Sequence, residues 1–156
     1  MAIVKTLDWR AIIARGIIAG IIGGILIDAF LYVAQILPAH GSILGLWQFV
    51  ASTAIGPNAF TNPNSAWLGL FMHLCTSIAW GIAFSYVAHT RPGISNHPYI
   101  SGLVYGVIVM IIMDIVLMVA KSFPSPTVQS ALTALIAHCI FFGLPVSLYV
   151  SRAMRT

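Results

Sequence analysis

Four long apolar segments dominate the sequence and constrain the fold more than any other feature. They cover residues 11–37, 66–88, 100–120 and 130–150. Each reaches the roughly 20 residues that a helix needs to cross the hydrocarbon core of a bilayer. A segment of this length is helical in lipid, because every backbone polar group must be paired inside the protein. The sequence therefore predicts an all-α, polytopic membrane protein with four transmembrane helices.

The composition agrees with lipid as the main solvent. Apolar residues make up 60% of the 156 residues and charged residues only 6%, whereas a soluble domain carries about 25% charged residues. The length suits one domain, residues 1–156. The net charge is +4, but the Lys and Arg residues form no basic face of the kind that nucleic acids bind. We therefore expect the lipid bilayer as a partner, and no nucleic acid.

The placement of Lys and Arg predicts the orientation of the helices. Six of the seven, including Lys5, lie near the chain ends or in the 89–99 loop, and only Lys121 lies on the other side. Cytoplasmic loops carry an excess of these residues. Both termini are thus expected in the cytoplasm.

A shorter apolar stretch, residues 42–55, lies in the loop between the first two spans. It is too short to cross a bilayer, so it predicts an interfacial or re-entrant helix in the first outer loop. Trp47 suits the headgroup level of the membrane. Simple packing at the interface is one interpretation, and a lid over an outward-facing cavity is the other.

The two halves of the chain, residues 11–88 and 100–151, resemble each other. An offset of 86 residues relates three positions of the first span to three of the third, namely Gly16, Gly20 and Asp28 to Gly102, Gly106 and Asp114. The glycines, four residues apart, share a helix face, and small residues at this spacing let helices pack closely in lipid. The sequence thus predicts a pseudo-two-fold repeat of helix pairs, with its axis along the membrane normal.

Ionisable residues inside the spans are the candidate site. A rise of 1.5 Å per residue from the span ends places four of them in one layer outward of the midplane: Asp28, His73, Asp114 and His138. An Asp at this depth costs ~2.5–3.5 kcal/mol on insertion scales and is a functional candidate. Three interpretations stay open. The residues form Asp–His pairs that hold the bundle in register, they pass protons or ions, or they bind a metal ion or haem.

A family resemblance rests on residues 44–73 and on shorter motifs further along. The motifs are LGLWQFVAS at 44–52, Leu68-Gly69, His73, Tyr105-Gly106, Met113-Asp114 and Ala137-His138. Together they resemble uncharacterised four-helix bacterial inner-membrane proteins. A fainter similarity is to the YagU-type inner-membrane proteins linked to acid resistance. The resemblance implies an inner-membrane location and no reaction.

These features lead to a functional expectation that does not include catalysis. No nucleophile elbow, phosphate-binding Gly-rich loop or HExxH motif occurs in the sequence. We expect a small membrane transport or ligand-binding protein, with the four Asp and His residues as its polar centre. One alternative is a non-catalytic accessory subunit of a larger membrane complex, and another is a haem- or metal-binding membrane protein. Assembly of the protein into a homo-oligomer is compatible with each of these three functions.

Overall fold

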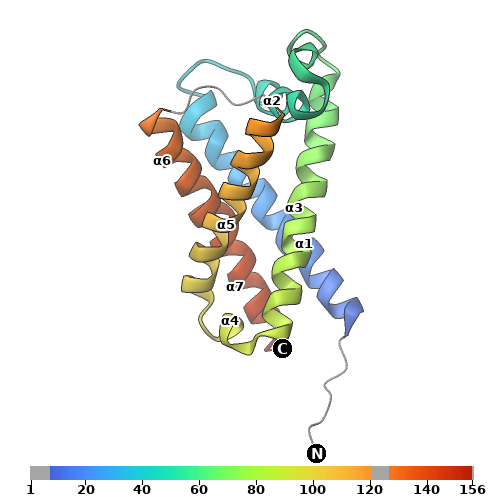
Figure 1. Ribbon diagram of the computed structural model, residues 1–156, viewed down its shortest axis with the longest axis vertical. Coiled ribbons are helices and arrows are strands. Elements are labelled where there is room, and N and C mark those ends of the chain that lie inside the picture. The colour runs from blue at the N-terminus through green and yellow to red at the C-terminus, as the bar shows by residue number, and fades with distance from the viewer. Residues whose placement is uncertain (1–7, 121–126, 156) are drawn as a thin grey trace, which may run out of the picture.

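Four long helices make up most of the molecule. The computed structural model describes residues 8–120 and 127–155. Within these ranges no strand occurs, and four helices are long and apolar enough to cross a membrane, namely Trp9–Ile36, Ser65–Thr90, Pro98–Val119 and Val128–Ala153 (Figure 1). The prediction of an all-α, polytopic membrane protein is confirmed. Lys5 and Lys121, on which the predicted orientation partly rests, lie outside the described residues.

The first and the fourth span each contain a π-helical segment. In the first, α1 (Trp9–Leu31) continues into η1 (Tyr32–Ile36). The fourth consists of α6 (Val128–Ile136), the π-helix η3 (Ala137–Gly143) and α7 (Leu144–Ala153). Pro145 is the second residue after η3, and its missing N–H leaves an upstream carbonyl without its usual partner. The proline therefore provides a local cause for the widened turn of η3. Such π-helical turns are frequent at functional sites.

Each span begins one or two residues before its predicted start, and capping residues explain the difference. Asp8 precedes α1, and its Oδ1 accepts a hydrogen bond from the Ala11 N–H at 3.1 Å. Thr127 precedes α6 and forms a reciprocal capping box with Ser130. Pro98 stands at the first position of α5 (Pro98–Val119), where its fixed φ suits a helix start.

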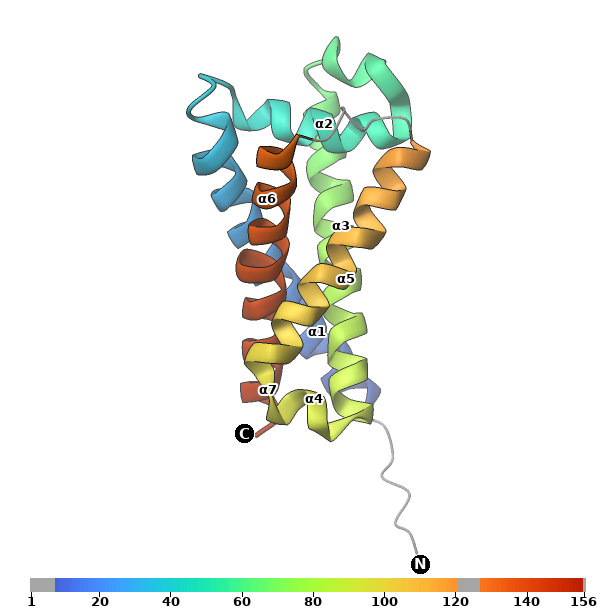
Figure 2. The same ribbon diagram turned by 60° about the vertical axis from the view of Figure 1, so that its left-hand side comes forward.

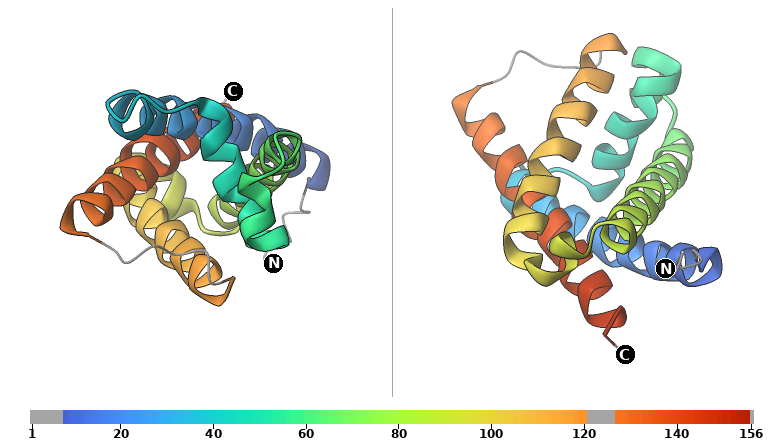
Figure 3. Two further views of the ribbon diagram at one scale, coloured as in Figure 1. Left: turned by 90° about the horizontal axis from the view of Figure 1, so that it is seen from above. Right: turned by 60° about the horizontal axis from the view of Figure 1, so that its bottom comes forward.

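Short helices cover the two ends of the bundle. α2 (Ile43–Ile55), the helix expected over residues 42–55, lies across one end together with the 3₁₀ turn η2 (Gly56–Phe60) (Figures 1 and 2). α4 (Pro92–Asn96) lies at the opposite end, where α1 begins and α7 ends. The view from above shows α2 crossing over the ends of the long helices (Figure 3). The two ends of the described chain thus lie on the side away from α2.

Glycines bring α1 and α3 (Ser65–Thr90) into direct backbone contact. A Cβ built at Gly20 would lie 2.6 Å from the Cα of Ile78, and one built at Gly81 would lie 2.8 Å from the Cα of Gly20. Real Cβ atoms do not approach backbone atoms this closely. The two helices therefore pack without intervening side chains, in the manner of small-residue contacts in membranes.

A contact of the same kind joins α5 to the fourth span. A Cβ at Gly102 would lie 2.8 Å from the Cα of Leu144, and a Cβ at Gly143 would lie 2.9 Å from the Cα of Gly106. In both helix pairs, one glycine of the later helix meets a glycine pair four residues apart in the earlier helix.

α3 and α5 meet through side chains in the half of the bundle that lies away from α2. The Tyr105 hydroxyl donates a hydrogen bond to the Trp80 carbonyl. The Tyr105 ring makes edge-on contacts with Trp80, at 6.2 Å between ring centroids, and with Phe84, at 4.8 Å. These contacts close the bundle below the region that contains the candidate site.

Candidate functional site

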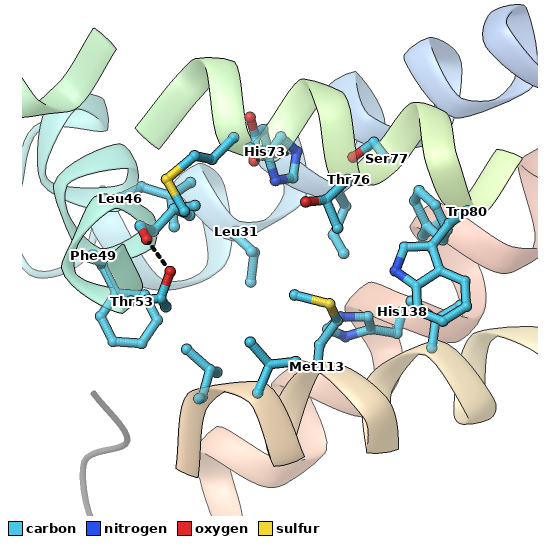
Figure 4. A pocket seen from close by; sticks show the side chains of 18 of the residues that line it. Leu31, Leu46, Phe49, Thr53, His73, Thr76, Ser77, Trp80, Met113 and His138 are labelled. Atoms are coloured by element: carbon cyan, nitrogen blue, oxygen red, sulfur yellow. Dashed lines mark hydrogen bonds and ion pairs between the residues drawn. The ribbon is translucent and has the colours of Figure 1, made fainter. Parts of the chain in front are cut away.

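A cavity of about 250 Å³ lies between the long helices, on the side of the Trp80–Tyr105 contact that faces α2. All four predicted site residues line it. His73 and Trp80 come from α3, Met113 and His138 from the opposite wall, and Leu46, Phe49 and Thr53 from α2 at one end (Figure 4). The remaining lining is mostly apolar: Ile27, Leu31, Val50, Met72, Val109, Val116, Leu117 and Phe142.

Asp28 and His73 form the one ion pair found among the described residues. The His73 Nε2 lies 3.2 Å from the Asp28 Oδ1 and 3.3 Å from the Gly24 carbonyl oxygen. Both neighbours are acceptors, so Nε2 must carry a proton to bond to either. The pair joins α1 to α3.

Trp47 completes the surroundings of Asp28 through a contact that was not predicted from the sequence. Its Nε1–H donates a hydrogen bond of 3.1 Å to the Asp28 Oδ2. The indole therefore reaches from α2 to the Asp28 side chain of α1. Since residues of α2 also line the cavity, the geometry favours the interpretation of α2 as a cover over a cavity.

α2 is seated on α3 by a further backbone contact. A Cβ built at Gly69 would lie 2.6 Å from the carbonyl carbon of Trp47 and 3.1 Å from the backbone N of Ala51. Only glycine permits this approach. Gly69 thereby holds the segment of α2 that presents Trp47 to Asp28.

His138 lies in the π-helix η3 and is oriented by its own helix. Its Nδ1 lies 2.8 Å from the carbonyl oxygen of Ala134, so Nδ1 carries the proton. The Nε2 of a neutral His138 is then a hydrogen-bond acceptor. Asp114 lines the same cavity and interacts electrostatically with His138. No hydrogen bond or ion pair joins the two side chains in the described part of the chain.

The four predicted residues thus share a cavity but do not form one compact cluster. Among the described residues, no group of three or more His, Cys, Asp or Glu side chains is placed to hold a metal ion. Depth along a helix can be counted in a sequence, and this count suggested a shared layer. It could not show which members touch, since that depends on how each helix is rotated.

Other polar side chains in the cavity were not among the predicted site residues. Thr76 and Ser77 follow His73 by one turn, and Trp80 follows by two. Residues three, four and seven positions apart share a helix face, so this spacing was the available signal. Thr53 of α2 had no such signal, because the position of α2 depends on its contacts with α3.

Comparison with known proteins identifies a family and no characterised relative. No curated protein and no solved structure matches the chain. A family model described as a family of unknown function, DUF6789, matches residues 11–155. The match covers nearly the whole sequence and all four spans. The chain therefore belongs to DUF6789, a family of unknown function.

Proposed function

We propose that this protein binds a small molecule in the cavity beneath α2, as part of a solute-transport or ligand-binding role. The observation that carries the proposal is the cavity itself, in which Asp28, His73, Asp114 and His138 share a mostly apolar lining. Ligand sites in proteins combine such linings with a small number of polar groups that orient the ligand.

The size of the cavity suits a small ligand. A cavity of ~150 Å³ lined by apolar side chains can hold benzene, and this cavity measures about 250 Å³. A molecule with one ring and a short substituent would fit. Ordered water could fill the space in its absence, because several polar groups are available to bind it.

The arrangement of the helix pairs supports the same location. The matching glycine contacts of α1 with α3 and of α5 with the fourth span support the proposed repeat of residues 11–88 and 100–151. In repeat-based membrane transporters the substrate site lies between the repeats. The cavity is lined by residues of both proposed halves.

The proposal extends to location and orientation. We infer a bacterial inner membrane with both termini in the cytoplasm, supported by the Lys and Arg distribution. The ends of the described chain lie together, opposite α2, so α2 and the covered end of the cavity would then face the periplasm. The similarity to YagU-type proteins stays a prediction.

A comparison of two phenylalanine variants tests the proposal. Thr76 lines the cavity, whereas its neighbour Cys75 is exposed on α3 and does not. Wild type, Thr76→Phe and Cys75→Phe are purified in mild detergent, and bound small molecules are extracted and identified by mass spectrometry. A molecule present in wild type and Cys75→Phe but lost from Thr76→Phe is the expected result.

The same preparations separate the alternatives. Equal small-molecule content in all three proteins would contradict binding in the cavity. A Soret band would support haem, a stoichiometric metal would support a metal site, and a co-purifying membrane protein would support an accessory subunit.

A further inference from the structure

The charged residues that line the cavity are acidic, and this limits the class of ligand that the cavity can bind. Two carboxylates, Asp28 and Asp114, line the cavity, and no Lys or Arg occurs among the described lining residues. Asp28 is compensated by His73 and by the Trp47 N–H. Asp114 makes no hydrogen bond or ion pair with any described residue. The carboxylate with fewer polar partners therefore lies on the α5 wall, where His138 is its neighbour.

The groups beside Asp114 are hydrogen-bond acceptors as well. His138 directs its Nδ1–H to its own helix, at the Ala134 carbonyl, so its Nε2 offers a lone pair. A carboxylate and a lone pair leave this wall without a donor of its own. A ligand that brings donors or positive charge complements it, and one that brings only acceptors does not.

The rest of the lining indicates an organic cation rather than an inorganic one. Phe49, Trp80 and Phe142 line the cavity together with Met72 and Met113. Aromatic faces attract organic ammonium groups, whereas hard metal ions need six or more oxygen ligands. The absence of a three-residue His, Cys, Asp or Glu group among the described residues agrees with this choice.

We infer that the cavity binds a small organic ammonium ion with an apolar body, and that Asp114 is its counter-ion. This inference rests on the proposed function and names the ligand class of the same site. The ammonium group would lie at Asp114 and His138, and the apolar body against the aromatic side chains. A free amine and an aminophospholipid headgroup share this ammonium chemistry.

Three probes with one ring and different charge test the inference. Benzylammonium, benzyl alcohol and benzoate are titrated at pH 7 into the full-length protein in detergent, and the heat is corrected for empty micelles. We expect saturable binding of benzylammonium, affinity for benzyl alcohol lower by about tenfold or more, and no binding of benzoate.

Two matched variants test whether the Asp114 carboxylate determines the affinity for benzylammonium. Asp114→Asn should reduce the affinity for benzylammonium to that for benzyl alcohol, and leave benzyl alcohol unaffected. Asp8→Asn is the control, because Asp8 caps α1 outside the cavity and Asn is an equally good cap. It should leave the affinities for all three probes unchanged.

Competition then distinguishes the two sources of the ammonium group. Displacement of benzylammonium by a short-chain phosphatidylethanolamine, but not by the matching phosphatidylglycerol, identifies the headgroup. No displacement by either lipid identifies a free amine. Both results support ammonium recognition, and displacement by both lipids would overturn it.

The remaining outcomes separate failure of this inference from failure of the proposed function. If benzyl alcohol binds as tightly as benzylammonium, and Thr76→Phe abolishes both, the cavity is a ligand site but not an ammonium site. Tight benzylammonium binding that survives Asp114→Asn overturns the role of Asp114. If none of the probes binds saturably, the ammonium inference is overturned, and the mass-spectrometry comparison of Thr76→Phe with Cys75→Phe still decides the proposed function.

Discussion

At the scale of single residues, Asp28 is the ionisable group of the cavity with polar side-chain partners on two other helices. It contacts His73 from α3 and Trp47 from α2, so one carboxylate joins three helices. An Asp inside a bilayer is costly when it is unpaired. The two polar partners offset that cost, which explains how a carboxylate is tolerated in so apolar a chain.

A double-mutant cycle should show that Asp28 and His73 depend on each other. Asp28→Asn and His73→Gln each leave the other group without its partner. Breaking a fully buried pair costs about 3–5 kcal/mol, and the side chains here are 16% and 18% exposed, so we expect a smaller loss of about 1–3 kcal/mol for each. The double variant should lose less than the sum, with a coupling of at least ~0.5 kcal/mol. The free energy of unfolding in detergent is the measurement.

The pair Asp114 and His138 is the control for that cycle. These two side chains line the same cavity without a hydrogen bond between them in the described structure, so Asp114→Asn and His138→Gln should show weaker coupling. Strict additivity for Asp28 and His73 would mean that the two act as independent residues.

At this scale, a sequence supports predictions that depend on depth along a helix alone. Counting along the spans placed Asp28, His73, Asp114 and His138 in one layer, and all four do line one cavity. The same reasoning missed the hydrogen bond from Trp47, because it crosses from a loop helix to a span. Its geometry depends on how α2 docks, which hydropathy does not report.

At the scale of elements, α2 is the part of the fold whose position matters most for the site. Its sequence predicted a short helix, and Ser42 caps that helix through a hydrogen bond from the Leu44 N–H. Its placement depends on Gly69 in α3, where the two backbones meet. The glycine itself is visible in the sequence, but the sequence does not show which helix packs against it.

Replacing Gly69 by Ala should loosen the cover over the cavity. The added methyl group would lie 2.6 Å from the carbonyl carbon of Trp47, so α2 must shift and carry Trp47 away from Asp28. A cysteine at Thr76, in a background with Cys75 and Cys139 replaced by Ser, should then react faster with a water-soluble thiol reagent. We expect a severalfold increase in that rate.

Gly45→Ala is the matched control for this variant. Gly45 also lies in α2, but a Cβ there would meet nothing within 4 Å. The rate at position 76 should therefore stay at the wild-type value. Equal rates in Gly69→Ala and wild type would show that α2 does not govern access to the cavity.

The π-helices are the elements that sequence patterns missed. Residues 130–150 read as a continuous apolar helix, yet η3 interrupts this span at Ala137–Gly143. The wider turn changes the register between His138 and the glycine contact at Gly143. Aligned on Gly81 and Gly143, His138 corresponds to Thr76 and not to His73. The polar residues of the two helix pairs therefore occupy different turns.

At the scale of the whole molecule, hydropathy was enough to predict the spans because lipid imposes a simple length requirement on each helix. Helix packing was harder to predict, since lipid tails are as apolar as the helices and provide no hydrophobic drive for one arrangement. The glycine contacts supply that specificity. Two glycine pairs of the sequence, Gly16 with Gly20 and Gly102 with Gly106, are indeed contact points.

The orientation of the whole molecule in the membrane leads to the last prediction. Ser42 lies at the α2 end of the bundle, and Ser95 lies in α4 at the opposite end. The excess of Lys and Arg on the side of Ser95 predicts that this side is cytoplasmic. In a background without Cys75 and Cys139, Ser42→Cys should react with a membrane-impermeant maleimide in intact cells, and Ser95→Cys should react only after the cells are opened. Position 125, also expected on the outer side, lies outside the described residues. The reverse pattern, with position 95 labelled in intact cells and position 42 protected, would contradict this orientation and indicate the opposite one. The covered end of the cavity would then face the cytoplasm, and any ligand reaching it past α2 would come from inside the cell.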